Sequence, residues 1–412
     1  MNNQKIEKVN NTYWIRVVGL FFAGWILMYA TRTIFNPIMG VVGEEFNLSN
    51  TELGLANSIF FLTYAVAQIP FGAIGDKYGR KLVITIGFLG LAISTFLSGL
   101  ASTFAMFLLI RAVAGIAQGA YYGPQYALSS ESIPKDKVTL GNAIINSGMA
   151  FGTSGGYLLS SALVLEGGQD WSQPFFIMAV PTAIVGILFY TMLKERVVQE
   201  NEDIEPETVE QEVANNGNVF KQIFGNKNLV FAFILLFGSI YANFVIITWL
   251  PQFLISERGF EGSSVGFISS LVPWASIPGA LFFARMKDKI GSTKKLAYFL
   301  VPLAALSVSL IAFVENQTLL IAVLILYGLT GKLALDPILI SYVNTHAPKG
   351  RLSTTLSAYN FIGMSGSILA PYVTGFISDN AGSMQIGFYL AAIMLIVALV
   401  LFGMMAQDTE KA

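Results

Sequence analysis

Residues 53–101 read LGLANSIFFLTYAVAQIPFGAIGDKYGRKLVITIGFLGLAISTFLSGLA, two apolar stretches joined by one charged turn. Each stretch is about 20 residues long, which at about 1.5 Å per residue matches the hydrocarbon core of a bilayer. The turn holds Asp76, Lys77, Arg80 and Lys81. This arrangement predicts two membrane-spanning helices with a basic turn between them.

The same pattern repeats along the whole chain. Of its 412 residues, 54% are hydrophobic and 12% are charged, whereas a soluble domain carries about 25% charged residues. This composition excludes a disordered chain, a coiled coil and an ordinary soluble enzyme. We therefore expect an all-α membrane protein with twelve transmembrane helices. The apolar stretches lie at roughly 17–40, 53–75, 82–101, 104–126, 138–162, 172–193, 229–251, 263–284, 296–314, 318–343, 352–377 and 384–406.

The basic residues predict how these helices are oriented, because Lys and Arg are enriched in cytoplasmic loops. Of the 24 Lys and Arg residues, three lie inside predicted spans: Arg32, Arg111 and Lys332. Only Arg258 lies in a loop of one side, and the remaining 20 lie in the tails or in loops of the other side. We expect an integral protein of the plasma (cytoplasmic) membrane with both termini in the cytoplasm.

The chain divides into two halves of six spans each. Residues between them are polar and acidic, a composition typical of a solvated linker. We expect an N-terminal six-helix bundle over 1–193, an acidic cytoplasmic linker over 194–228 and a C-terminal six-helix bundle over 229–412. Two such repeats can rock against each other.

The turn after the second span carries a specific motif. Residues 72–81 read GAIGDKYGRK, which resembles G-x-x-x-D-x-x-G-R-K, the signature loop of the major facilitator superfamily. In that family the loop holds the two halves together in the outward-facing state. The resemblance implies twelve helices in two pseudo-symmetric bundles, and a conformational latch. Its residues here are Gly72, Asp76, Gly79, Arg80 and Lys81, together with Arg111.

Two further spans resemble the same superfamily. In the fourth span, Arg111, Gly115 and Gly119 match its R-x-x-x-G-x-x-x-G pattern. Glycines four residues apart share one helix face and let a neighbouring helix approach closely. The fifth span has a glycine pattern similar to that of efflux antiporters, but Thr153 stands where they have a proline.

An arginine in the first span extends the resemblance to particular groups within the superfamily. Residues 29–37 read YATRTIFNP and place Arg32 deep in the span. This is similar to the anion:cation symporter and organic-phosphate groups, in which that arginine contacts a carboxylate or phosphate of the substrate. Some proton-coupled members also carry acids where this chain has Thr31 and Gln118. Proton coupling in this chain would therefore need another acid.

Lys332 and Asp336 supply that possibility in the tenth span. They lie four residues apart and therefore on one helix face. A charge at the bilayer centre costs roughly 2.5–3.5 kcal/mol on insertion scales, so the pair is either a neutralising ion pair or a coupling site. In the second case, an anion that competes for Lys332 would release Asp336 to take up a proton.

The resemblance further implies that the first, fourth, seventh and tenth spans line a central cavity. Arg32 and Lys332 would then bind one anion from opposite halves, with Asp336 as the proton-coupling residue. We expect His346, the single histidine, to be structural. Polar and aromatic residues at a compatible depth complete the predicted substrate site: Tyr29, Asn36, Tyr64, Gln68, Gln118, Tyr121, Tyr122, Asn146, Asn243, Tyr359 and Asn360.

These observations predict a secondary active transporter that moves a small organic anion by alternating access, coupled to protons or a counter-ion. The anion would be a carboxylate, a sugar acid or a phosphate ester. The sequence has no P-loop and no cysteine, and we expect no enzymatic activity, cofactor, metal or nucleic-acid partner, and a monomer. Two alternatives remain: a drug or metabolite efflux antiporter, and a sensing receptor that has kept the fold but not transport.

Overall fold

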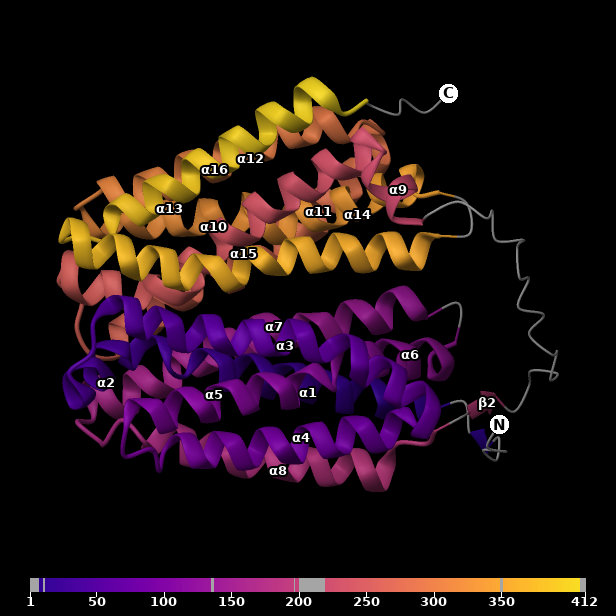
Figure 1. Ribbon diagram of the computed structural model, residues 1–412, viewed down its shortest axis with the longest axis horizontal. Helices are drawn as coiled ribbons and strands as arrows, with labels where there is room; N and C mark the ends of the chain where they lie inside the picture. Colours follow the sequence, from indigo (N-terminus) through magenta and orange to yellow (C-terminus); the bar gives the residue numbers. More distant parts are fainter. Residues whose placement is uncertain are drawn as a thin grey trace. The chain divides into compact units, whose positions relative to one another are not determined.

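The computed structural model describes residues 7–9, 12–134, 137–195, 197–199, 219–348 and 351–407. Within these ranges the chain is almost entirely helical (Figure 1). Two three-residue strands, β1 (Glu7–Val9) and β2 (Val197–Gln199), pair in parallel. The predicted all-α fold is therefore confirmed. Most of the predicted acidic linker, residues 200–218, lies outside the described residues.

Twelve helical segments of the described chain are long and apolar enough to span a membrane, as predicted. Eight are single helices: α3 (Asn50–Tyr78), α4 (Arg80–Ser98), α8 (Gln173–Met192), α10 (Lys227–Arg258), α11 (Ser263–Ile290), α12 (Thr293–Phe313), α15 (Leu352–Ala381) and α16 (Gln385–Met405).

The other four spans are composite, and a short helix α9 (Val219–Phe224) precedes α10. The composite spans are α1 (Tyr13–Thr33) with η1 (Asn36–Ile38) and α2 (Met39–Phe46), α5 (Phe104–Gly119) with α6 (Tyr122–Ser132), α7 (Val138–Ser160) with the π-helix η2 (Ser161–Glu166), and α13 (Gln317–Thr330) with α14 (Lys332–His346).

Side-chain caps and glycines set several helix ends. The side chains of Thr103, Ser292 and Asn316 each accept a hydrogen bond from a backbone N–H in the first turn of α5, α12 and α13. Gly79 separates α3 from α4 with φ 112°, and Gly382 ends α15 with φ 74°. Only glycine adopts such angles without strain, so the signature loop needs Gly79 for its turn.

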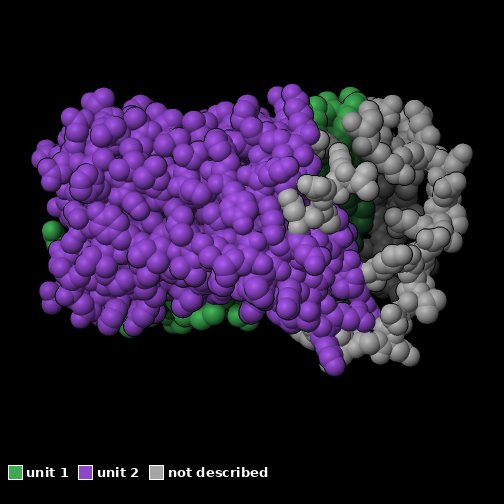
Figure 2. Space-filling view, turned by 90° about the horizontal axis from the view of Figure 1, so that it is seen from above, with its two compact units in different colours: residues 1–46, 59–208 green, residues 47–58, 209–412 purple. Residues whose placement is uncertain are grey.

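The chain forms two compact units, coloured separately in Figure 2. Unit 1 contains residues 1–46 and 59–208, and unit 2 contains residues 47–58 and 209–412. Helix α3 therefore begins in unit 2 and ends in unit 1. The boundary after residue 208 falls within the stretch predicted to be the linker.

In unit 1, the glycines of α7 allow it to lie directly against α1. A Cβ atom on Gly152 would lie 2.8 Å from the Cβ atom of Tyr29 and closer still to the carbonyl oxygen of Ile26. Gly148 and Gly156 meet α1 just as closely. The glycine pattern of this span thus provides close helix packing, which in membranes replaces much of the hydrophobic driving force.

In unit 2, the first turn of α3 is bound to the end of α15. The Asp379 carboxylate accepts hydrogen bonds from the backbone N–H of Asn50 (2.9 Å), from the N–H of Thr51 (2.7 Å) and from the Thr51 hydroxyl (2.5 Å). One turn later, a Cβ atom on Gly54 would overlap the carbonyl of Pro371. A carboxylate at a helix N-terminus satisfies free N–H groups and the helix dipole, so Asp379 fixes where α3 starts.

Three composite spans are interrupted next to the polar residues singled out in the sequence. Helix α1 ends one residue after Arg32, α5 ends one residue after Gln118, and α14 begins at Lys332. Irregular backbone at membrane depth is tolerated where it is buried in protein or lines a cavity. The apolar stretches predict continuous helices at these positions, and the structure differs by interrupting them.

We expect Gly152→Ala to destabilise the protein and Gly155→Ala to leave its stability unchanged. Both glycines lie in α7, but nothing lies within 4 Å of a Cβ atom at Gly155. Overpacking at Gly152 should cost about 1–3 kcal/mol and lower the melting temperature in detergent by several degrees. Equal melting temperatures of the two variants would contradict the packing of α7 on α1.

Candidate functional site

Arg32, in the last turn of α1, is buried in unit 1 with 6% of its surface exposed. Its Nε donates a hydrogen bond of 2.6 Å to Oε1 of Gln118 in α5. Its Nη2 is buried and has no hydrogen-bond partner in the described part of the chain. No acid among the described residues forms an ion pair with it. The helix C-terminus favours a cation here, but the guanidinium retains unused hydrogen-bonding capacity.

Aromatic rings surround the same guanidinium. Its central carbon lies 4.7 Å from the ring centroid of Tyr29 and 4.5 Å from that of Tyr64. The ring of Phe60 is 5.9 Å away. Cation–π contacts of this kind are worth about 0.5–2 kcal/mol each, so they stabilise the charge without adding an acid beside it. Of the predicted site, Tyr29, Tyr64, Gln118 and Arg32 therefore come together.

Arg111 is a second buried cation in unit 1, with 2% of its surface exposed. Its guanidinium carbon lies 4.6 Å from the centroid of Phe60 and 5.5 Å from that of Phe35. Phe60 therefore faces both arginines. Arg111, which the family resemblance assigns to the latch, lies among aromatic side chains and near Arg32.

Other predicted site residues of unit 1 have packing partners. The Tyr121 hydroxyl donates to the carbonyl of Phe21 (3.0 Å), and its ring is almost fully buried among aromatic side chains. Asn36 hydrogen-bonds to Tyr157. These placements favour a role in helix packing. Tyr122 and Gln68 are half-buried, and Asn146 accepts a hydrogen bond of 3.0 Å from the hydroxyl of Tyr126.

In unit 2, Lys332 and Asp336 form an ion pair. The distance from Nζ to Oδ2 is 2.5 Å, and each side chain has about a fifth of its surface exposed. The other carboxylate oxygen, Oδ1, is buried, and no described residue forms a hydrogen bond with it. Lys332 is the first residue of α14, where the helix dipole disfavours a cation. Asp336 offsets that cost.

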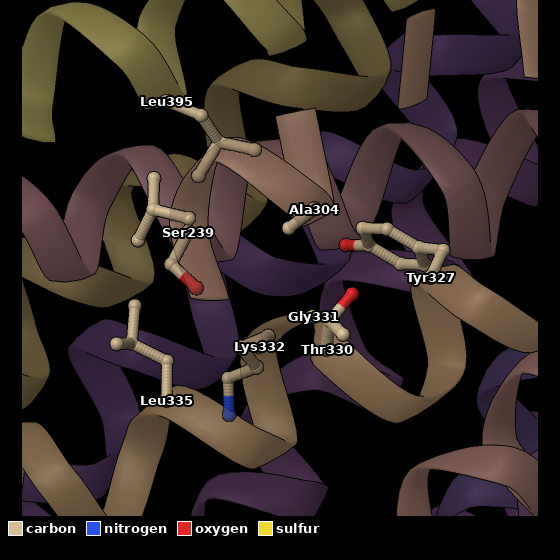
Figure 3. A pocket seen from close by; sticks show the side chains of 9 residues that line it. Ser239, Ala304, Tyr327, Thr330, Gly331, Lys332, Leu335 and Leu395 are labelled. Carbon is tan, nitrogen blue, oxygen red and sulfur yellow. The ribbon is translucent and has the colours of Figure 1, made fainter. Parts of the chain in front are cut away.

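A small cavity lies beside Lys332 (Figure 3). It has a volume of about 10 Å³, room for roughly one water molecule. The hydroxyl-bearing side chains of Ser239, Tyr327 and Thr330 surround it. Gly331 is required at the adjoining break, because a Cβ atom there would lie 2.7 Å from the carbonyl oxygen of Tyr327.

The remaining predicted residues of unit 2 are buried to different degrees. Tyr359 is 6% exposed and its ring packs on Phe233. Asn243 and Asn360 are half-buried. His346 lies against the ring of Tyr342, at 4.1 Å between centroids, and its Nδ1 lies 2.9 Å from the Tyr342 carbonyl oxygen.

The signature loop forms a charge network at the start of α4. Arg80 forms ion pairs with Asp76 (3.1 Å) and with Glu131 at the end of α6. The Glu195 carboxylate accepts hydrogen bonds from the backbone N–H groups of Arg80 and of Lys81, the second at 2.9 Å. Sequence reasoning identified the loop but missed Glu131 and Glu195. They lie 51 and 115 residues from Arg80, and no local pattern marks them.

A comparison with protein families agrees with this architecture. Residues 21–371 match the model of the Major Facilitator Superfamily. The chain belongs to that superfamily. It is therefore a membrane transporter that acts on small molecules, and it is not an enzyme.

Relatives within the Major Facilitator Superfamily cover almost the whole chain. A phosphoglycerate transporter protein of Salmonella typhimurium is 23% identical over 94% of this chain and 88% of its own. A cis,cis-muconate transport protein of Acinetobacter baylyi is 24% identical over 94% and 92%. The crystal structure of a bacterial homologue of the human lysosomal transporter Spinster superposes with a TM-score of 0.81, at 15% identity over 96% of this chain and 97% of that chain.

The ion pair of α14 makes a testable prediction. Removing one partner leaves the other charge without its ion pair, so Lys332→Met and Asp336→Asn should each lower the free energy of unfolding by about 1–3 kcal/mol. The loss is smaller than for a fully buried pair because both side chains are partly exposed. The double variant should lose less than the sum of the single losses. Thermal unfolding of the four proteins in detergent measures this, and strict additivity would contradict the pair.

Proposed function

We propose that the protein moves a small organic anion across the plasma membrane and that Arg32 binds the anionic group. The observation that carries this proposal is the buried guanidinium of Arg32, for which the described residues provide no hydrogen-bond partner at Nη2 and no paired acid. An unpaired charge in a membrane-spanning segment is costly. A carboxylate or phosphate would satisfy it with charge-assisted hydrogen bonds.

The printed activities of two relatives support the same chemistry. Phosphoglycerate and cis,cis-muconate are both small organic anions, and their transporters match this chain over nearly its full length. At 23–24% identity these names define no substrate for this chain. They define the first compounds to test.

We further propose that Lys332 is a second anion-binding group and that Asp336 couples transport to protons. An anion that competes for Lys332 weakens the Lys332–Asp336 pair, and the released carboxylate then takes up a proton. The buried Oδ1 of Asp336 supports this role, since among the described residues no hydrogen bond holds that oxygen in its ionised form. Arg80 and its acidic partners would act as the conformational latch.

The distribution of basic residues supports an orientation with both termini in the cytoplasm. No observation suggests a stable oligomer, and we propose a monomer. The efflux alternative rests mainly on the glycines of α7, and those glycines are accounted for by packing on α1.

Arg32→Lys should abolish most anion binding while leaving the protein folded. A lysine keeps the charge but loses the planar donor set, which should weaken binding by about 10- to 100-fold. Binding is measured as the rise in melting temperature with phosphoglycerate, cis,cis-muconate or other organic acids. Arg258→Lys is the matched control, because Arg258 lies in unit 2 and contacts the carbonyl oxygens of Glu257 and Ala312.

If no organic acid stabilises the wild-type protein, or if Arg32→Lys binds as well as wild type, the proposal is wrong. Extrusion of amphipathic compounds by Arg32→Lys at the wild-type rate would favour the efflux antiporter. Binding without exchange in proteoliposomes would favour a sensing receptor.

Asp336→Asn should uncouple uptake from the proton gradient. In proteoliposomes, wild-type uptake of the bound anion should rise when the outside is acidified, whereas the variant should still exchange labelled anion without responding to the gradient. A side-chain amide neither takes up nor releases a proton at physiological pH. Gradient-driven uptake by the variant at the wild-type level would show that the pair of α14 is only structural.

A further inference from the structure

The side-chain amide of Gln118 is completely used by protein partners. Its Oε1 accepts the hydrogen bond from Nε of Arg32 at 2.6 Å. Its Nε2 donates to the carbonyl oxygen of Met28 and to the hydroxyl of Thr31, each at 3.1 Å. Both N–H groups therefore have acceptors, and the side chain is 1% exposed. Gln118 has no donor left for a solute.

The amide has only one acceptable orientation. Turning it over would bring its NH₂ group against the Nε–H of Arg32 and its oxygen against the Met28 carbonyl, two unfavourable contacts. Thr31 is held in turn, because its hydroxyl also lies within hydrogen-bond distance of the carbonyl oxygens of Leu27 (2.9 Å) and Met28 (3.0 Å). Gln118 is thus a fixed acceptor at the end of α5, tied to the last turns of α1.

This acceptor binds Arg32 at Nε, and Nη2 stays without a partner. The guanidinium plane is held by the Nε bond and by the rings of Tyr29 and Tyr64. A carboxylate or phosphate can then meet a guanidinium that is already oriented, which lowers the entropy lost on binding.

We propose that Gln118 is a positioning residue for Arg32 that does not itself contact the transported anion. The inference rests on the proposed anion binding at Arg32. Because an amide is neutral at every physiological pH, Gln118 holds the guanidinium without neutralising it. The positive charge of Arg32 therefore stays available for the anion at every physiological pH. Proton coupling then depends on Asp336 in unit 2.

The groups around Arg32 and Gln118 are consistent with a positive charge at Arg32 that no acid neutralises. The titratable and charged groups near Arg32 and Gln118 are Arg111 of α5, Tyr29 of α1, Tyr64 of α3 and Tyr126 of α6. None of these groups of the described residues is a carboxylic acid. A carboxylate introduced at Gln118 would thus be the first acid to reach Arg32.

Gln118→Glu tests the proposal directly. At pH 8 the introduced carboxylate should pair with Arg32 and compete with the anion, weakening binding by at least about tenfold. An opposite charge at hydrogen-bond distance favours the ionised carboxylate, so the loss of affinity should persist at pH 5. The probes are phosphoglycerate and cis,cis-muconate, measured by thermal stabilisation of the full-length protein against pH.

Two further variants keep the result interpretable. Gln118→Met removes the hydrogen bonds without adding charge, so binding should weaken equally at both pH values. Gln125→Glu is the matched control, because Gln125 is equally buried in unit 1 but hydrogen-bonds to Trp25 and Ser129 instead of Arg32. The affinity of Gln125→Glu relative to that of wild type should be the same at both pH values.

The outcomes separate this inference from the function on which it rests. If neither probe stabilises the wild-type protein, anion binding itself fails. If binding depends on Arg32 but Gln118→Glu binds as tightly as wild type at pH 8 and at pH 5, the positioning role is wrong while the proposed function stands. A loss of the same size in Gln125→Glu would also overturn it, because a buried carboxylate anywhere in unit 1 would then suffice.

Discussion

A guanidinium inside a membrane-spanning bundle must be stabilised by the protein, because an unpaired charge there costs several kcal/mol. Arg32 receives only part of that stabilisation: a hydrogen bond that it donates to Gln118, contacts with the rings of Tyr29 and Tyr64, and the C-terminal end of α1. All of these partners are neutral. The protein supports the position of the charge without cancelling it, and this incomplete compensation is the feature on which the proposed anion transport depends.

The helix packing of unit 1 makes this arrangement possible. Glycines of α7 bring it against α1, and Gly115 and Gly119 of α5 leave no room for a Cβ atom against α3. The ends of α1 and α5 therefore meet, and Gln118 reaches Arg32 across 86 residues of sequence. Unit 2 treats its cation differently, because Lys332 is paired with Asp336 four residues away. In the proposed mechanism, unit 1 holds a constant charge at Arg32, and the charge balance of the Lys332–Asp336 pair in unit 2 changes when an anion binds.

Composition and hydropathy were sufficient to predict the twelve spans, and the positions of Arg32, Lys332 and Asp336 were evident because charges are rare in such stretches. The interruptions beside Arg32 and Lys332 were not predicted, since apolar residues continue on both sides of each break. Tyr121 was assigned to the substrate site by its depth alone, whereas the structure buries it among aromatic rings. Long-range partners such as Glu195 have no signal in a single sequence.

The most direct test is an experimental structure of the protein with a stabilising organic acid bound, beginning with phosphoglycerate. The account predicts density for the acid group within hydrogen-bond distance of Nη2 of Arg32, with Nε still bound to Gln118. Density for the acid elsewhere, with Nη2 unpartnered or paired to an acid of the protein, would contradict it.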